Sequence, residues 1–276
     1  MQVIRSHPHR RARTRPRHDG LVTSSPARDA TTTGRYRYLL NGQEIEVDER
    51  FAVTVGIDGV FVSSARAAPG TRLSVECVYS SDGVTGCVLE WTSELEGMAP
   101  SVLASYVVAS DGSIEATWSV ADGPERTDSI PAGLIAPSFF PLMRVFSGRS
   151  VAKLVAVVPN PLPVLVPDIR DPKAVENFLT PLLGDRFAAS VVDGVCEVDG
   201  VDRECVVVDY RGGSYDVDAT VYLDEGGLLL RYTWPQEGVG EWDVRLSDIE
   251  GSWPRPSTWQ QAPPPPCRCG RSESLS

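Results

Sequence analysis

Residues 73–92, LSVECVYSSDGVTGCVLEWT, contain the pattern that decides the fold class. Two apolar, strand-like runs, Leu73–Tyr79 and Cys87–Thr92, flank a turn that contains Asp82-Gly83. Such dipeptides close β-hairpins, because both central residues of a type I′ turn need a positive φ. The stretch therefore predicts a pair of antiparallel strands. Pairs of the same kind recur outward along the chain at Asn41-Gly42, Asp58-Gly59, Asp111-Gly112, Asp193-Gly194 and Asp199-Gly200.

Short runs with alternating character lie between these turns and predict a mostly antiparallel meander. In the first half of the chain the expected strands are Arg35–Leu40, Glu44–Val55, Val60–Arg66, Leu73–Tyr79, Cys87–Thr92, Ser105–Val108 and Ile114–Val120. In the second half they are Val151–Val158, Ala188–Val192, Glu204–Tyr210, Tyr215–Leu223, Leu228–Trp234 and Glu241–Ile249. Strands on both sides of a helical middle favour one domain over two. The expected fold is mostly β, a long antiparallel sheet curled into a half-barrel around one or two short helices.

The middle of the chain lacks this alternation and predicts the helices. Residues Pro137–Phe146 are typical of one or two helical turns entered through Pro141, because proline suits the first helical position. Asp171 followed by proline is a typical helix start, so Asp171–Leu179 predicts a second helix. The proline-rich segment Pro159–Pro167 should be extended.

The two ends differ from the body in composition. Residues 1–33 are rich in Arg, Ser and Thr, and we expect them to form a disordered basic tail. Residues 254–276 are rich in proline, and we expect a second disordered tail there. Residues 34–253 remain as a single β half-barrel domain.

Charge and histidine content exclude several classes of function. The chain carries a net charge of −11, and an acidic body is repelled by phosphate backbones, which argues against nucleic acid as a partner. All three histidines, His7, His9 and His18, lie in the basic tail. The body therefore offers no imidazole for Ser-His-Asp or Cys-His catalysis or for a zinc site. Because calcium and nucleotide motifs are also missing, we predict no metal and no cofactor.

Targeting signals and cysteines bear on the cellular compartment. The sequence contains no apolar run of about 18 residues, which predicts no membrane span, and no apolar core follows the basic N-terminus, so we expect a cytoplasmic protein. The six cysteines form three close pairs, Cys77/Cys87, Cys196/Cys205 and Cys267/Cys269. The first two pairs flank predicted hairpin turns and can face each other across two strands. We expect reduced thiols, with cross-strand disulfides as the alternative.

The strand order, the Phe-rich segment around Phe139–Phe146 and the length of the body resemble a known group of half-barrels over residues 35–250. This group is the VioE/LolA-like superfamily, which includes bacterial lipoprotein carriers and stand-alone Pictet–Spenglerases. Lipoprotein carriers work in the periplasm and need an export signal. The enzymes are cytoplasmic, need no cofactor and act on aromatic amines. Because no export signal is recognisable in this sequence, the resemblance favours the enzymes over the carriers.

Carboxylates in apolar runs are the candidate catalytic residues, because desolvation raises a carboxyl pKa toward neutrality and suits it to proton transfer. Glu90 lies in Val-Leu-Glu-Trp and Glu76 in Ser-Val-Glu-Cys-Val. On the predicted hairpin they should lie close to opposite each other on one face, where mutual repulsion raises at least one pKa. The alternative is that strand alternation simply places both glutamates in solvent.

Arginines and aromatic residues are the candidate substrate-binding groups. An arginine can hold a substrate carboxylate through two parallel hydrogen bonds, and the candidates are Arg66, Arg72 and Arg144. Tyr106 and Trp118 belong to adjacent predicted strands and can line one cavity. Core packing is the alternative for these two rings, and a position at the helix rim is the alternative for Arg144.

These features lead to two main hypotheses of function. The first is a cofactor-independent enzyme of secondary metabolism that condenses or cyclises an aromatic amine by carboxylate acid–base catalysis, with Pictet–Spengler ring closure as one such reaction. The second is a non-catalytic carrier of a lipid or hydrophobic metabolite, with every carboxylate outside the cavity. Both predict a hydrophobic or aromatic small molecule as partner, with no nucleic acid and no membrane, and leave a homodimer open. A third reading is a scaffold that needs no cavity.

Overall fold

The computed structural model describes residues 32–254, except 57–58, 81–82, 99, 122, 134–136, 157–160 and 213–217, and does not describe the side chains of 189–191. The predicted tails lie outside this range, apart from Thr32, Thr33 and Pro254. Strands β1 to β8 are Thr32–Leu40, Gln43–Gly56, Gly59–Ala68, Thr71–Ser80, Gly83–Ser93, Ser101–Val108, Ile114–Val120 and Arg126–Ile130. Strand β9 (Ser138–Phe139) precedes helix α1 (Arg144–Ala156). Strands β10 to β15 are Leu162–Pro167, Pro181–Val198, Val201–Arg211, Ala219–Leu223, Leu229–Gln236 and Gly240–Gly251.

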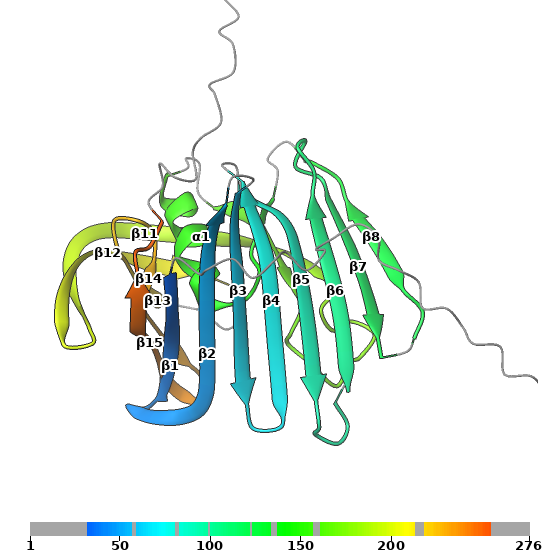
Figure 1. Cartoon of the computed structure of the whole chain (residues 1–276), viewed down its shortest axis with the longest axis horizontal. Helices are drawn as coiled ribbons and strands as arrows, with labels where there is room; N and C mark the ends of the chain where they lie inside the picture. The colour runs from blue at the N-terminus through cyan, green and yellow to red at the C-terminus, as the bar shows by residue number, and fades with distance from the viewer. Residues whose placement is uncertain are drawn as a thin grey trace, which may run out of the picture.

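The fifteen strands of the described residues belong to one sheet, in the order β8-β7-β6-β5-β4-β3-β2-β1-β15-β14-β13-β12-β11-β10-β9. Neighbours are antiparallel except β9 and β10, which are parallel. The first and last strands pair with each other, so the two ends of the described chain meet in the middle of the sheet. The sheet curls around α1 without closing, as Figure 1 shows. The predicted half-barrel is confirmed, with a single helix in the described residues.

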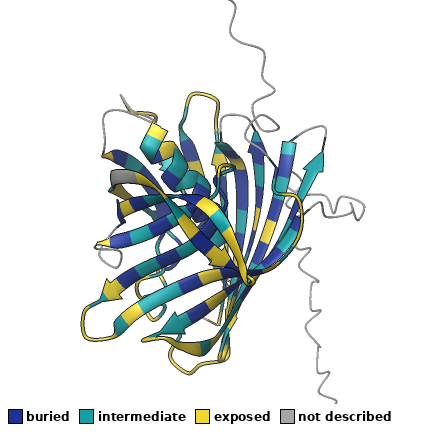
Figure 2. Cartoon of the chain, turned by 90° about the vertical axis from the view of Figure 1, so that its left-hand side faces the viewer, coloured by how far each residue is buried: buried dark blue, intermediate teal, exposed yellow. Residues whose placement is uncertain are grey.

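Strand alternation gives the sheet one buried and one exposed face. Along β4, the side chains of Leu73, Val75, Cys77 and Tyr79 are buried, whereas Glu76 between them is exposed. Figure 2 shows the same alternation on many other strands. Because successive side chains of a strand point to opposite faces, the buried set forms one continuous core on the concave side.

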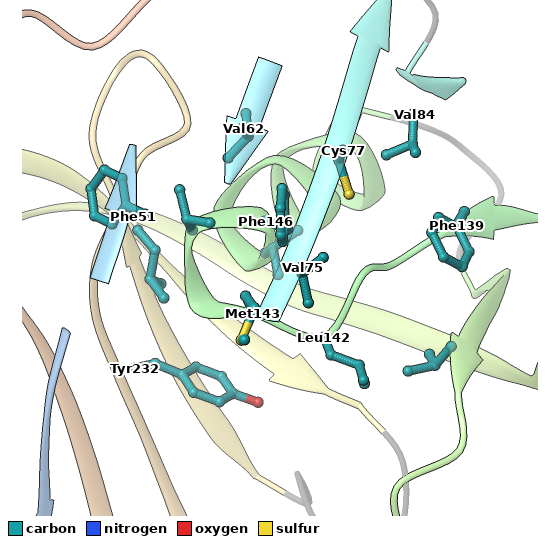
Figure 3. Packing of buried hydrophobic residues seen from close by; sticks show 14 of the residues in the cluster. Phe51, Val62, Val75, Cys77, Val84, Phe139, Leu142, Met143, Phe146 and Tyr232 are labelled. Carbon is teal, nitrogen blue, oxygen red and sulfur yellow. The ribbon is translucent and has the colours of Figure 1, made fainter. Parts of the chain in front are cut away.

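Helix α1 fills part of the hollow and packs by close approach to the sheet. Val145, Phe146, Val151 and Leu154 are buried, and the Phe146 ring stacks on Tyr79 of β4 at a centroid distance of 6.0 Å. Figure 3 shows Phe146 in the same apolar cluster as β4 side chains. The helix thus bridges the two halves of the sheet, because it also contacts β11, β13 and β14.

The helices were predicted at the wrong places. Pro137–Phe146 forms strand β9 and an irregular segment, and the helix begins only at Arg144. Residues 151–156 of the predicted strand Val151–Val158 belong to that helix. Polar and apolar residues do not separate into two faces in this helix, because Ser147 is buried together with Phe146 and Val151, so its sequence lacks a clear amphipathic period. Its apolar second half, taken alone, resembles a buried strand.

The predicted helix Asp171–Leu179 is a series of turns. Its expected cap exists, since the Asp171 carboxylate accepts a hydrogen bond from the backbone N–H of Lys173 at 2.9 Å. Only one bond of α-helical spacing follows, from the Phe178 N–H to the Ala174 carbonyl, and Leu179 turns to a positive φ of 60°. One good cap does not outweigh the cost of nucleating a helix. Extended backbone is confirmed for Leu162–Pro167.

The glycine-containing turns were mostly placed correctly. Asn41-Gly42 and Asp199-Gly200 have positive φ values at both residues, as a type I′ turn requires. Asp111-Gly112 also lies in a turn, whereas Asp58 and Asp82 lie outside the described residues. Asp193-Gly194 was wrong as a turn, because it lies inside the long strand β11, where Gly194 pairs with Cys205.

The described cysteines are buried free thiols. Cys77 and Cys87 pair directly across β4 and β5, and their sulfur atoms are 2.9 Å apart. Burial raises the pKa of the Cys77 thiol. Cys196 pairs with Arg203 and not with Cys205, so the expected face-to-face placement was wrong for this second pair. Cys267 and Cys269 lie outside the described residues.

Candidate ligand-binding site

A cleft of about 730 Å³ opens at one side of the hollow. Its walls come from the end of β3, the segment between β9 and α1, β10 with the loop after it, the start of β11, and β14 with β15. This size lies within the usual range for sites that hold small organic molecules. The curled sheet thus brings together residues from both halves of the chain at one pocket.

One wall of the cleft is aromatic. Trp234 of β14 and Trp242 of β15 are directly paired across the two strands, and their rings stack with centroids 5.4 Å apart and planes 4° apart. The Trp242 indole N–H donates to the Gln236 side-chain oxygen at 2.7 Å, which fixes that ring. The stacked pair gives the cleft a rigid apolar wall, in which the half-buried Trp242 is more exposed than the buried Trp234.

Arg144 stands at the inner end of this wall. It is the first residue of α1, and its guanidinium carbon lies 4.5 Å from the centre of the Tyr232 ring and 4.9 Å from that of Trp234. These cation–π contacts hold the positive charge over the rings. The prediction that Arg144 faces a cavity agrees with this position, since Arg144 lines the cleft.

A buried carboxylate behind Arg144 was missed in the sequence. Glu49 of β2 is 0% exposed and accepts hydrogen bonds from the Arg144 backbone N–H and the Tyr38 hydroxyl, each at 2.6 Å. Burial, followed by the Glu49 charge, raises the pKa of Tyr38 to about 12. The signal was present: Glu49 shares the inward positions of its strand with Phe51 and Val53.

The charged residues of the cleft wall are mostly cationic. Four arginines, Arg66, Arg144, Arg170 and Arg186, stand against two acids, Asp168 and Asp185. Arg170 pairs with Asp168 at 2.6 Å and holds the pKa of that carboxyl below its usual value. This positive wall contrasts with the net charge of −11 for the whole chain.

The predicted charged site residues fall into two groups. Arg66 lines the cleft together with Arg144. Arg72, Glu76 and Glu90 are exposed on the opposite, outer face of β4 and β5. Glu90 pairs with Ser74, so the two glutamates are diagonal neighbours on one face and not directly opposite. Both glutamates therefore face solvent, as expected if strand alternation alone sets their position.

The two predicted cavity aromatics are packing residues. Tyr106 is buried, stacks on Phe139 at 4.7 Å, and donates its hydroxyl proton to the Leu179 carbonyl at 2.6 Å. Trp118 on the neighbouring strand is half-buried and packs against the same core. Neither ring is among the residues that line the cleft.

Within the described residues, no cluster of three or more His, Cys, Asp or Glu side chains is arranged to hold a metal ion. The same part of the chain contains no helix with the length and apolarity needed to cross a bilayer.

Two solved structures align with most of this chain. A β-barrel-like protein of the domain of unknown function DUF1849 from Brucella abortus aligns with 81% of this chain and 98% of its own, at 9% identity and a TM-score of 0.47. A DUF1329 family protein from Desulfovibrio piger aligns with 81% of this chain and 87% of its own, at 11% identity and a TM-score of 0.24. No protein-family model and no curated protein matches the sequence. The cleft itself is therefore the basis for assigning a function.

Proposed function

We propose that the protein binds a small hydrophobic or aromatic molecule in the cleft and acts as its carrier. The observation that carries this proposal is the open cleft of about 730 Å³, walled by the stacked Trp234 and Trp242 and backed by Arg144. A concave, largely apolar site with a few fixed polar groups is the usual form of a small-molecule site. Of the two branches of the half-barrel resemblance, the carrier is the better supported.

The charges of the cleft do not favour condensation of an aromatic amine. A wall with four arginines and two aspartates repels a protonated amine. Arg170 lowers the pKa of the Asp168 carboxyl, so that group stays ionised at neutral pH and is a poor general acid. Glu76 and Glu90 lie outside the cleft on the outer face. Asp185, the other acid of the cleft, is exposed and not desolvated, so cyclase activity stays a prediction.

Ligand binding is tested by filling the cleft. N-phenyl-1-naphthylamine, a neutral apolar fluorophore, should bind the full chain with one-to-one stoichiometry and gain fluorescence. Leu182 lines the cleft, and Leu182→Trp adds bulk there, so we expect affinity for the fluorophore to fall at least about tenfold. Leu103→Trp on the exposed face of β6 is the matched control and should leave affinity within about twofold. If the fluorophore binds saturably and its affinity is unchanged in Leu182→Trp, it binds outside the cleft, and this result would contradict the proposal.

Carrier and enzyme are separated by the fate of the ligand. The purified protein should release its co-purified or added ligand unchanged on denaturation, as judged by mass spectrometry. Time-dependent conversion of an aromatic amine and an aldehyde by the wild-type chain would favour the enzyme instead.

A further inference from the structure

A narrow chamber continues from the inner end of the cleft toward α1. It shares Phe140, Arg144 and Arg186 with the cleft, and its other walls include Ser147 of α1 and Tyr232 of β14. Its volume of about 20 Å³ is enough for one water-sized group. The chamber can therefore hold a single small polar group whose parent molecule lies in the cleft.

Three buried hydrogen-bond donors without a protein acceptor belong to residues that line the chamber or the cleft next to it. They are the Arg186 Nε–H, the Trp234 indole N–H and the Ser147 hydroxyl. Trp234 and Ser147 are 7% and 6% exposed, so bulk water does not solvate them freely. Arginine and tryptophan side chains can only donate, and a buried donor without an acceptor has lost the hydrogen bond that it made to water in the unfolded chain. The chemistry of these groups calls for an acceptor.

Charge selects the kind of acceptor. Arg144 and Arg186 line both the cleft and the chamber, whereas the carboxylate of Asp168 is already engaged by Arg170. Glu49 lies behind Arg144 and bonds to its backbone, and it lines neither space. An anion at the inner end would thus meet the guanidinium groups of Arg144 and Arg186 and, in addition, the donors of Trp234 and Ser147, which favours an ionised acceptor over a neutral one.

We propose that the inner end of the cleft is a carboxylate-binding subsite and that the ligand is a hydrophobic monocarboxylic acid. This inference rests on the proposed function and gives the ligand its class and its direction. The carboxylate lies between Arg144 and Arg186 with one oxygen toward the chamber. The apolar body extends outward along Trp234 and Trp242. A water-sized chamber suits a planar carboxylate better than a tetrahedral phosphate.

Matched ligands test the subsite on the unmodified chain. Decanoate, decanol and decyl phosphate are titrated against the bound neutral fluorophore at fixed salt, and displacement gives their affinities. We expect decanoate to bind at least about tenfold more tightly than decanol, and more tightly than decyl phosphate. Equal affinities for acid and alcohol would mean that water satisfies the donors, which would overturn the subsite while the carrier function stands. Failure of every ligand and of the fluorophore to bind would overturn both. Preference for the phosphate would overturn the carboxylate assignment.

Two variants locate the effect. Arg186→Gln should remove most of the preference for decanoate, lowering its affinity about tenfold and leaving that of decanol within about twofold. Ser147→Ala is a smaller change and should lower decanoate affinity about threefold. It tests the subsite even if Arg186→Gln does not fold. Arg72→Gln on the outer face is the matched control and should change neither affinity. Full decanoate preference in both subsite variants would contradict the proposal.

Discussion

At the scale of single residues, Glu49 connects the core to Arg144, which lines the cleft. Its two carboxylate oxygens accept from the Tyr38 hydroxyl and the Arg144 backbone, so it ties β1, β2 and the start of α1 together. We expect Glu49→Ala to lower the free energy of unfolding by about 3 kcal/mol, because two buried donors lose their acceptor. Glu49→Gln should cost only about 1 kcal/mol, because its amide can accept from Arg144 and donate to a rotated Tyr38 hydroxyl.

Urea denaturation measures these changes, with Glu76→Gln on the outer face as the matched control, expected within about 0.5 kcal/mol of wild type. A second readout is the pKa of Tyr38, which should fall below about 12 in Glu49→Gln because the Glu49 charge is one of its causes. Equal stability of Glu49→Ala and wild type would contradict this role.

Residue-scale prediction from the sequence worked where one position decides the outcome by its own chemistry. A type I′ turn at Asn41-Gly42 and at Asp199-Gly200 requires positive φ values, and the structure has positive φ values at all four residues. It failed where the face of a strand decides. Glu76, Glu90 and Glu49 all lie in apolar runs, but only Glu49 falls on the inward positions of its strand. Assigning that face from Phe51 and Val53 would have found Glu49.

At the scale of elements, Gly148 allows α1 to approach the sheet. A Cβ atom at this position would lie 2.7 Å from the Leu229 backbone nitrogen and closer still to the Gly227 carbonyl oxygen. Backbone atoms cannot move aside as a flexible side chain can, so we expect Gly148→Ala to destabilise the fold by at least about 2 kcal/mol, despite alanine's better helix propensity. Thermal unfolding followed by circular dichroism measures the effect. Gly184→Ala, where a Cβ meets nothing within 4 Å, is the control. Unchanged stability in Gly148→Ala would show that the helix packs less closely than described.

The elements themselves were predicted unevenly for a physical reason. Strands that alternate between core and solvent carry a period of two in their sequence, and most of them were found. Helix α1 has buried residues at 145–148, 151 and 154, and Ser147 is among them, so no clean polar face marks it. Its start also depends on Glu49, which is 95 residues away in sequence. Local signals alone cannot supply such a cap.

At the scale of the whole molecule, the predicted meander of hairpins accounts for the half-barrel, but it does not account for the seam, which is the pairing of β1 with β15. Consecutive hairpins order β1 to β8 and β10 to β15 by themselves, because each strand pairs with the next in sequence. Pairing of β1 with β15 joins residues such as Tyr36 and Leu246, and no turn sets that register. The cleft lies across both halves, with Arg66 from one and Trp234 from the other, so its composition depends on the seam. Because sequence patterns do not reveal this pairing, only two of the predicted site residues, Arg66 and Arg144, line the cleft in the structure.

The concave core also sets the response of the whole fold to alkaline pH. Burial is the main cause that raises the pKa values of four core tyrosines, Tyr36, Tyr38, Tyr79 and Tyr106. Below the ordinary tyrosine pKa of about 10, these groups are protonated in both the folded and unfolded states, and their contribution to stability is complete. Above it the unfolded chain releases protons that the folded chain keeps. Each such tyrosine then lowers the free energy of unfolding by about 1.4 kcal/mol per pH unit until its folded-state pKa is reached.

We therefore expect steep loss of stability above about pH 10, with cooperative unfolding in which tyrosinate absorbance rises together with the loss of the β-sheet circular dichroism signal. Tyr106→Phe removes one titrating group and should reduce the slope of stability against pH by about 1.4 kcal/mol per unit. The same variant loses the hydrogen bond to Leu179, so its stability at neutral pH should be about 1 kcal/mol lower, while fluorophore binding in the cleft stays unchanged. Ionisation of all eight tyrosines near pH 10 with the sheet intact would mean that the four core rings are open to water, and the enclosed hollow described here would be wrong.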